Sequence, residues 1–400
     1  QVVEWIKHSL LADQFAFSVL LMIVLLGAIM GAVAYSILLE RKISAWIQDR
    51  HGPNRAGPRG LLQPIADGLK FFLKEDIIPR NVDRILFLFA PWLIFAVALL
   101  GYAVIPWGGT FRWPWMDADA EPLRAQVASI DIGLLYILAF GSMGVYGVVL
   151  GGWASNNKYS FFGGMRSAAQ MLSYEVPMGL AILVVVMTTG NLRLEGIVLA
   201  QNGSLGSIPG ANWTILYHPL AAFLVFVAML AESNRMPFDL GESEQELVGG
   251  YHTEYSALKL ALFFLAEYAH MITAGAFLVA LFFGGYLVPG WRWLNEDTSW
   301  LAMIARMVVF AAKVFLVIAF VMIVRWTLPR FRYDQVMRLA WKSLVPMGLA
   351  IVAAQAIIMF AGWSQWVSLF ASVLIVVLAA VIGAAGGTPV TGRQQSLMKQ

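Results

Sequence analysis

Long apolar segments alternate with shorter polar ones along the whole chain. Each apolar segment is close to the length of about 20 residues that an α-helix needs to cross the hydrocarbon core of a bilayer. The pattern predicts nine spans, near residues 15–39, 85–106, 130–152, 167–189, 216–231, 257–288, 301–326, 343–361 and 365–385. We therefore expect an all-α fold, a polytopic membrane helix bundle of about nine transmembrane helices.

Composition and charge distribution agree with a single membrane domain. The chain is 60% hydrophobic and 13% charged, and its mean hydropathy is +0.72, values typical of a protein whose solvent is largely lipid. The first apolar segment runs into Glu40 without a cleavage site, so we expect it to be retained as a span. Most of the 27 Lys and Arg residues fall in the C-terminal tail and in the loops after spans 1, 3, 5 and 7. The positive-inside rule places these loops and the C-terminus in the cytoplasm and the N-terminus outside.

The loop after the first span contains predicted structure of its own. Gly and Pro residues in the segment 49–60 indicate turns. Beyond them, four apolar side chains share one helical face and three charged ones share another: Leu62, Ile65, Leu69 and Phe72 against Asp67, Lys70 and Lys74. This pattern predicts an amphipathic helix at the cytoplasmic membrane surface. Such a helix either only anchors the protein or, through Asp67 and Lys70, lines a cavity.

The segment 232–254 places six carboxylates and one Arg between two apolar spans. The carboxylates are Glu232, Asp239, Glu242, Glu244, Glu246 and Glu254. An ionised carboxylate near hydrocarbon is unfavourable unless it is paired, hydrated or protonated. Carboxylates this close cannot all ionise at neutral pH, so we expect some raised pKa values and shared protons. The segment indicates an ion or proton path or a polar ligand site, and the alternative is a solvated acidic loop.

Few ionisable residues lie within the spans. Glu175 precedes Pro177, which favours a kink or a water-filled break in the helix. Glu267 in span 6 and Lys313 in span 7 are either part of a polar path or paired residues that fix helix packing.

The sequence lacks Cys and has few His, the residues that most often bind redox centres and metals. It has no Cys, which excludes a thiolate-bound iron-sulfur cluster, a Cys-based zinc site, a disulfide and a Cys nucleophile. Of the five His residues, only His252, near Glu254, stands at ligand spacing, so we expect no metal site.

Five strings of this sequence occur in the same order as in a known family. They are E-R-K at 40–42, G-P-N-R-A-G-P-R-G-L-L-Q-P-I-A-D-G-L-K-F-F-L-K-E at 52–75, G-W-A-S-N-N-K-Y-S at 152–160, R-S-A-A-Q-M-L-S-Y-E-V-P at 166–177 and the acidic segment E-S-N-R-M-P-F-D-L-G-E-S-E-Q-E-L-V-G-G-Y-H-T-E-Y at 232–255. Over residues 15–362 the chain resembles the quinone-chamber membrane subunit of respiratory complex I, which is the H subunit of the bacterial enzyme and subunit 1 of the mitochondrial one.

The resemblance implies a subunit of a proton-pumping NADH:quinone oxidoreductase that has no redox centre of its own. Such a protein forms the access tunnel and chamber for a quinone (ubiquinone or menaquinone), and FMN and the iron-sulfur clusters lie only in partner subunits. Quinone reduction then drives a change that passes along carboxylates toward the membrane arm. The implied partners are the peripheral-arm subunits at the quinone site, small membrane subunits and antiporter-like subunits, with no nucleic acid. The implied location is the bacterial cytoplasmic membrane.

The resemblance also assigns roles to individual residues. The polar lining of the tunnel is expected from Glu40, Arg41, Asp67, Lys70 and Arg235, and its apolar wall from Phe71, Phe72 and Phe238. The acidic path is expected from the six carboxylates of the segment 232–254 together with Tyr146 and Glu175.

The C-terminal part departs from the family pattern. The family core has eight spans, so we assign residues 1–362 to the quinone-chamber domain and 363–400 to an extra helix and a polar tail. Two other functions stay open. One is the related subunit of a membrane hydrogenase or formate-linked complex, although the unbroken string at 52–67 favours the quinone enzymes. The other is a free-standing proton-coupled transporter, a class that commonly shows inverted repeats, which this sequence does not display.

Overall fold

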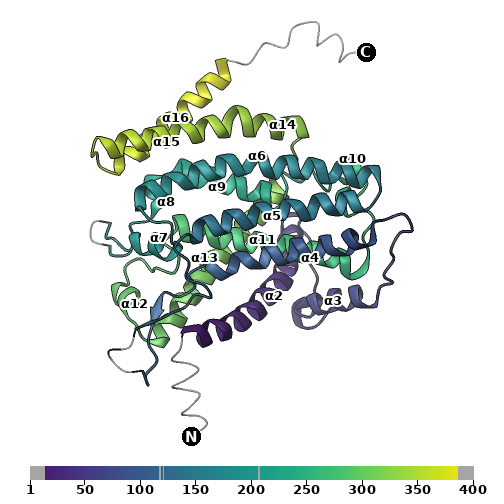
Figure 1. The fold of residues 1–400 in the computed structure, drawn as a ribbon, viewed down its shortest axis with the longest axis horizontal. Helices are drawn as coiled ribbons and strands as arrows, with labels where there is room; N and C mark the ends of the chain where they lie inside the picture. Colours follow the sequence, from purple (N-terminus) through teal and green to yellow (C-terminus); the bar gives the residue numbers. More distant parts are fainter. Residues whose placement is uncertain (1–13, 117–118, 120, 206–207, 386–400) are drawn as a thin grey trace.

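In the computed structural model, which describes residues 14–116, 119, 121–205 and 208–385, the chain folds into a bundle of long helices packed side by side (Figure 1). The long helices are α2 (Gln14–Ile47), α4 (Arg84–Leu100), α5 (Gly133–Ala154), α6 (Lys158–Thr189), α11 (Ala257–Phe282), α13 (Trp300–Thr327), α15 (Val345–Phe360) and α16 (Trp366–Ala385). Shorter helices are α3 (Gln63–Leu73), α7 (Leu194–Ala200), α8 (Thr214–Tyr217), α9 (Pro219–Glu232), α10 (Glu244–Leu247), α12 (Arg292–Glu296) and α14 (Tyr333–Leu339).

Single helical turns and one small sheet complete the described chain. The 3₁₀ turns are η2 (Pro58–Gly60), η3 (Gly101–Val104) and η4 (Gly250–His252), and the π-helical turn η5 (Ala340–Leu344) joins α14 to α15. Strands β1 (Thr110–Phe111) and β2 (Leu123–Arg124) pair antiparallel, with Thr110 opposite Arg124.

Eight helices in the described part of the chain are long and apolar enough to cross a membrane. The all-α membrane bundle predicted from the sequence is therefore confirmed. The fifth predicted span is divided by Pro219 into α8 and the 14-residue α9. At 1.5 Å per residue α9 is about 21 Å long, shorter than a hydrocarbon core of about 30 Å.

Several boundaries differ from the predicted spans. Helix α2 continues eight residues beyond its predicted end, to Ile47, and so includes Glu40. Helix α6 begins nine residues before its predicted start, where the Asn157 side chain accepts a hydrogen bond from the backbone N of Tyr159 at 2.9 Å. Its first turns contain Gly163, which brings the helix against the loop before α11: a Cβ there would lie 2.7 Å from Gly250 Cα. Helix α11 ends at Phe282, before Gly284 and Gly285, both of which have positive φ.

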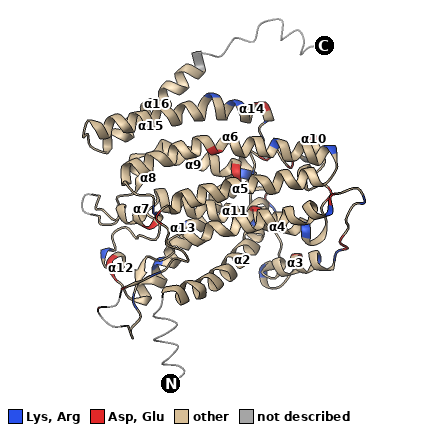
Figure 2. Ribbon diagram, viewed as in Figure 1, with Lys and Arg blue, Asp and Glu red and all other residues tan. Residues whose placement is uncertain are grey.

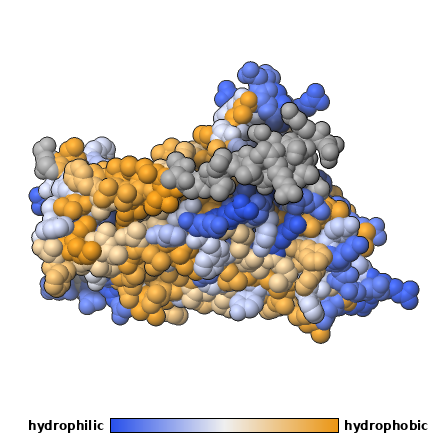
Figure 3. Space-filling view, turned by 90° about the horizontal axis from the view of Figure 1, so that it is seen from above, coloured by the Kyte–Doolittle hydropathy of each residue, from blue (hydrophilic) through white to orange (hydrophobic). Residues whose placement is uncertain are grey.

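Polar groups collect at the ends of the bundle. Helices α3, α10 and α14 lie at one end and α7 and α12 at the other (Figure 1). Lys, Arg, Asp and Glu gather mainly at these ends, with a small group inside (Figure 2). Hydrophobic side chains cover much of the face between the ends, and hydrophilic ones dominate the end that contains α3 and α10 (Figure 3). This distribution is the one a bilayer requires of a spanning bundle.

Buried polar groups fix the last described helix, α16, to the bundle. Ser368 Oγ donates to Gln355 Oε1 on α15 at 2.7 Å, and Gln355 Nε2 donates to Thr188 Oγ1 on α6 at 3.2 Å. The Thr188 hydroxyl lies 2.9 Å from His218 Nε2, so one hydrogen-bonded row joins α16, α15 and α6 to the residue that precedes α9. The predicted ninth helix thus packs on α15, while the predicted polar tail lies outside the described residues.

Candidate functional site

A buried ion-paired cluster joins three long helices to the acidic segment. We call Glu40, Arg235, Glu267, Tyr268 and Arg325 the central cluster. Arg235 Nη1 donates to Glu40 Oε2 at 3.0 Å, and the Tyr268 hydroxyl donates to the same oxygen at 2.8 Å. Arg325 donates to the other oxygen of Glu40, and Arg235 Nε lies 2.7 Å from Glu267 Oε1. The Arg235 guanidinium also lies 4.0 Å from the centre of the Tyr268 ring.

The charges of the central cluster balance. Two carboxylates meet two guanidinium groups, and the Arg235 and Glu40 side chains are only 3% and 8% exposed. Charges taken so far out of water are stable only when opposite charges and hydrogen bonds replace the lost solvent. Glu40 stands on α2, Glu267 and Tyr268 on α11 and Arg325 in the last turn of α13, so the cluster also fixes these helices around the segment after α9.

The next carboxylates along the segment have fewer cationic partners. Asp239 Oδ2 lies 3.3 Å from Arg330 Nη2, whereas Glu242 meets the Tyr251 hydroxyl at 3.3 Å and the His252 ring at 3.6 Å. Burial, reinforced by the nearby Asp239 charge, raises the pKa of Glu242 to about 7. Burial, opposed by Arg330, also raises the pKa of Asp239. Glu242 is therefore able to gain and lose a proton near neutral pH.

We expect Glu242 to be protonated below about pH 7 and ionised above it. Because the folded-state pKa is raised, the protein holds this proton in a pH range where an ordinary Glu has lost it, and releases it as the pH rises. An infrared titration should show protonated carboxyl absorption that disappears near pH 7. The Glu242→Gln variant should lack this step, and Glu296→Gln, at an exposed carboxylate on α12, should retain it. An unchanged step in Glu242→Gln would contradict the assignment.

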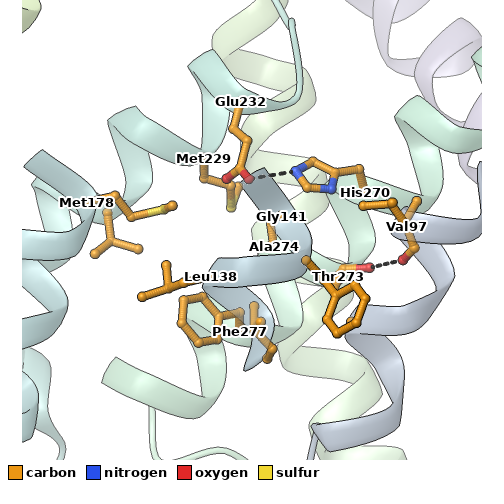
Figure 4. Close-up of a pocket in the computed structure, with 15 residues that line it drawn as sticks. Val97, Leu138, Gly141, Met178, Met229, Glu232, His270, Thr273, Ala274 and Phe277 are labelled. Carbon is orange, nitrogen blue, oxygen red and sulfur yellow. Dashed lines mark hydrogen bonds and ion pairs between the residues drawn. The ribbon is translucent and has the colours of Figure 1, made fainter. Parts of the chain in front are cut away.

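We call Glu242, Glu232 and Glu175 the acidic row. Glu232 and Glu175 are its two members within the bundle. Glu232 ends α9, and its Oε1 lies 3.4 Å from His270 Nε2 on α11. Figure 4 shows the two side chains facing each other at one end of a largely apolar cavity. Gly141 on α5 allows this carboxylate to approach, since a Cβ there would lie 2.9 Å from Glu232 Oε1. Glu175 accepts a hydrogen bond from Ser142.

Small cavities connect these carboxylates. One cavity of about 30 Å³ is lined by Glu267, His270, Tyr251 and Glu232, and one of about 10 Å³ is lined by Glu232 and Glu175. A water molecule needs roughly 10–15 Å³ of such volume and several polar partners. The first cavity therefore has room for one or two waters between the central cluster and Glu232, and the second is close to the size of one.

A larger, apolar cavity lies beneath α3. Its volume is about 430 Å³, and α2, α3, α4 and α11 supply its walls. The lining is Met30, Ala34, Ile37, Pro64, Asp67, Gly68, Phe71, Phe72, Trp92, Leu258, Ala261, Leu262, Phe264 and Leu265. Its polar group, Asp67, pairs with Arg41 at 2.7 Å and accepts a hydrogen bond from Gln63 at 3.1 Å. An apolar cavity of this size with a few polar groups is typical of a small-molecule site.

The cavity and the central cluster are adjacent. Ile37 lines the cavity and stands one helical turn before Glu40 on α2. Leu265 lines it and stands two and three residues before Glu267 and Tyr268 on α11. The same two helices therefore present apolar side chains to the cavity and polar ones to the cluster.

The other residues predicted from the sequence lie apart from the cluster. Phe238 packs in the core between Tyr174 and Phe331 and does not line the cavity. Lys70 is exposed on α3 near the Phe71 ring. Tyr146 is 62% exposed on α5.

Two of the predicted carboxylates also stand away from the cluster. Glu246 pairs with Arg166 at 2.5 Å and is exposed, and Glu254 accepts from Asn157 at 2.6 Å. The Glu244 side chain lies outside what the structure describes.

Sequence reasoning missed the cationic partners. Arg325 lies at the end of predicted span 7 and Arg330 just beyond it. From the sequence both are only positive charges that orient the chain, although they pair with Glu40 and Asp239. His270 is not among the predicted site residues, although it lies on the same helix as Glu267 and faces Glu232. The one available signal was an Arg within the last turn of a long apolar helix, where a charge needs a partner.

Fold and site together define a polytopic membrane protein with an internal charged network beside an apolar cavity. A family model described as NADH dehydrogenase matches residues 20–356. An NADH-quinone oxidoreductase H subunit of Cytophaga hutchinsonii is 48% identical over 82% of this chain and 92% of its own length. The corresponding protein of Leptospira biflexa is 49% identical over 86% of this chain and 94% of its own length. That of Thermomicrobium roseum is 47% identical over 82% of this chain and 91% of its own length. The chain belongs to this family, the membrane-embedded H subunits of the enzyme complex NADH-quinone oxidoreductase.

Proposed function

We propose that this chain forms the quinone access tunnel and binding chamber of a proton-pumping NADH:quinone oxidoreductase, together with the acidic path that couples quinone reduction to proton translocation. The observation that supports the tunnel most directly is the apolar cavity of about 430 Å³ under α3, one helical turn from the central cluster. The family membership supports quinone as the ligand.

The lining of the cavity fits an amphipathic ligand. A long isoprenoid tail requires an apolar wall, which α2 and α11 supply, and a quinone headgroup requires a few polar groups. The ion pair of Arg41 and Asp67 lies at the wall, and the central cluster lies one turn further along both helices. In this proposal the tail occupies the cavity and the headgroup passes toward partner subunits. Those partners hold FMN and the iron-sulfur clusters, since this chain has no Cys.

The acidic row supplies a proton path of alternating carboxylates and small cavities. Glu242 titrates near neutral pH, and Glu232 and Glu175 share one cavity. Glu267 and Glu232 share another, so the central cluster and the row are connected. A change of charge at the quinone alters the field at the buried carboxylates, because a medium of low dielectric constant screens charge weakly. Proton uptake and release along the row are the expected response.

The proposal includes an orientation and partners. The end with α3 and α10 faces the cytoplasm and the peripheral-arm subunits, with the N-terminus outside and the C-terminus in the cytoplasm of a bacterial cell. Small membrane subunits and antiporter-like subunits continue the acidic path in the membrane arm. The distribution of Lys and Arg supports this orientation.

A bulky side chain in the cavity should block the tunnel. Gly68 lines the cavity from α3, and no atom lies within 4 Å of a Cβ placed there. In the assembled complex we expect Gly68→Phe to reduce turnover of long-tailed quinones about tenfold or more, while NADH oxidation by an artificial acceptor upstream of the quinone is unchanged. Ala66→Phe is the matched control, because position 66 is exposed on the same helix and does not line the cavity. Equal quinone turnover in both variants would contradict the tunnel, and equal loss with the artificial acceptor would indicate misassembly.

A further inference from the structure

We propose that His270 is a second proton-carrying group of the acidic row, which shares one proton with Glu232, so that the pair and not Glu232 alone determines the pH range of coupling. The proposal rests on the proposed function, because it concerns the same row. The imidazole and the carboxylate face each other in Figure 4, with Nε2 and Oε1 3.4 Å apart.

The position of His270 places it between the central cluster and the rest of the row. His270 follows Glu267 by three residues on α11, so the two side chains lie on the same face of the helix. Glu267 pairs with Arg235, and His270 reaches Glu232 at the end of α9. The cavity of about 30 Å³ is lined by four titratable groups: Glu267, His270, Glu232 and Tyr251. A water there can bridge the 3.4 Å gap, which is longer than a good hydrogen bond.

The surroundings of the pair contain few other titratable groups. From α11, His270 faces the cavity together with Glu267, and from α9 it meets Glu232. Tyr251 comes from the loop before α11. The residues that α4, α5 and α6 add to the two cavities beside His270 are apolar or glycine: Ile94, Val97, Ala98, Ile137, Leu138, Phe140, Gly141, Gly144, Met171 and Met178. From α6, Glu175 and Tyr174 line the cavity of about 10 Å³ that Glu232 also lines.

His270 is the cationic partner available to Glu232. Across the described ranges, no Lys or Arg lies within 4 Å of the Glu232 carboxylate. The guanidinium of Arg235, in the central cluster, is held by Glu40 and Glu267. The charge of Glu232 is therefore balanced locally only when the His270 ring is protonated.

One proton satisfies the pair in either of two forms. With the proton on the carboxyl, both side chains are neutral, and with the proton on Nε2 they are an ion pair. Transfer breaks one O–H bond and forms one N–H bond, moves no electron and leaves the net charge at zero. Loss of the proton leaves one negative charge among apolar side chains, which is unfavourable. Two interacting groups of this kind titrate in two macroscopic steps.

The test compares variants in the assembled complex in membrane vesicles. Replacing His270 with Gln keeps a polar side chain of similar length but removes the titratable ring. We expect His270→Gln to lower quinone-linked proton uptake about tenfold or more, and its pH profile to lose one titration step. His270→Arg restores a positive charge that does not exchange near neutral pH, because a guanidinium stays protonated, so proton uptake should stay low. Thr273→Val changes the largely apolar cavity of Figure 4, which His270 and Glu232 also line, without removing a titratable group, so it should keep the shape of the pH profile.

The outcomes separate this inference from the proposed function. If Glu232→Gln abolishes proton uptake while His270→Gln keeps the wild-type rate and profile, the inference on His270 is wrong and the path through Glu232 stands. Recovery of the wild-type profile in His270→Arg would also overturn it, because a fixed charge alone would then suffice. If Glu232→Gln itself pumps normally, the proposed path is wrong.

Discussion

Arg235→Met should destabilise the folded protein by about 3–5 kcal/mol, the range expected when one partner of a buried ion pair is removed. The variant leaves Glu40 and Glu267 facing each other with Arg325 as the remaining cation of the central cluster. Two buried carboxylates then share one positive charge, and the hydrogen bond from Arg235 to Glu40 is lost. Thermal unfolding of the purified complex, together with the amount of this chain that assembles, measures the effect.

Arg332→Met is the matched control for this prediction. Arg332 pairs with Asp334, but both side chains are largely exposed. Pairs of this kind contribute about 0–1 kcal/mol. The double variant Arg235→Met with Glu267→Gln should recover part of the lost stability, because it removes the excess negative charge. A loss for Arg235→Met no larger than for Arg332→Met would show that the cluster is not a stabilising centre.

Glu232→Gln should lower quinone-linked proton pumping by roughly 10²-fold or more, the effect expected when a proton-transfer group is removed. Glutamine keeps the size and polarity of the side chain but cannot exchange the proton that the row requires. NADH oxidation by an acceptor upstream of the quinone should stay at the wild-type rate, because this chain holds no redox centre in the proposed scheme. Proton uptake and electron transfer measured in the same vesicles distinguish the two effects.

Glu195→Gln provides a buried comparison for Glu232→Gln. Glu195 is buried on α7, at the other end of the bundle, and lies 3.7 Å from Arg124. It lines none of the cavities that connect the acidic row. Pumping should persist in Glu195→Gln, and full pumping in Glu232→Gln would remove Glu232 from the path.

Two different arrangements of carboxylates stand side by side in this protein. In the central cluster, guanidinium groups neutralise Glu40 and Glu267. In the row, Glu242 and Glu232 meet only hydroxyl or imidazole groups within the described chain. A nearby guanidinium favours the charged form of a carboxylate, whereas a carboxylate without such a partner takes up a proton more readily when a nearby charge changes. The second arrangement is the one suited to move protons.

Sequence patterns predicted the parts of this architecture that depend on local order. The spacing of Leu62, Ile65, Leu69 and Phe72 predicts α3, and the structure has a helix there with all four side chains exposed. The density of carboxylates in the segment 232–254 located the acidic loop. Both signals lie within a few helical turns of the chain, so a single sequence contains them.

The pairing of the charges could not be predicted in this way. Arg325 reaches Glu40 across 285 residues, and Arg235 reaches it across 195. No spacing rule connects such positions, because the packing of α2, α11 and α13 brings them together. The carboxylates of the segment look alike in the sequence, but their surroundings in the fold differ. Glu246 is exposed and pairs with Arg166, whereas Glu232 faces His270 inside the bundle.

Helix α16 determines which surface this protein presents beside α15. The family match ends at residue 356, inside α15, so α16 lies beyond the matched segment. The buried hydrogen bond from Ser368 to Gln355 holds α16 against α15, and its outer side presents Phe370 and Leu374. A chimeric complex whose other subunits rest directly on α15 would meet this helix in their place. Accommodating them would require breaking the hydrogen bond from Ser368 to Gln355, which leaves the amide oxygen of Gln355 without this partner while its nitrogen still donates to Thr188. The fit of this chain against its neighbours therefore depends on a helix outside the segment that the family model matches.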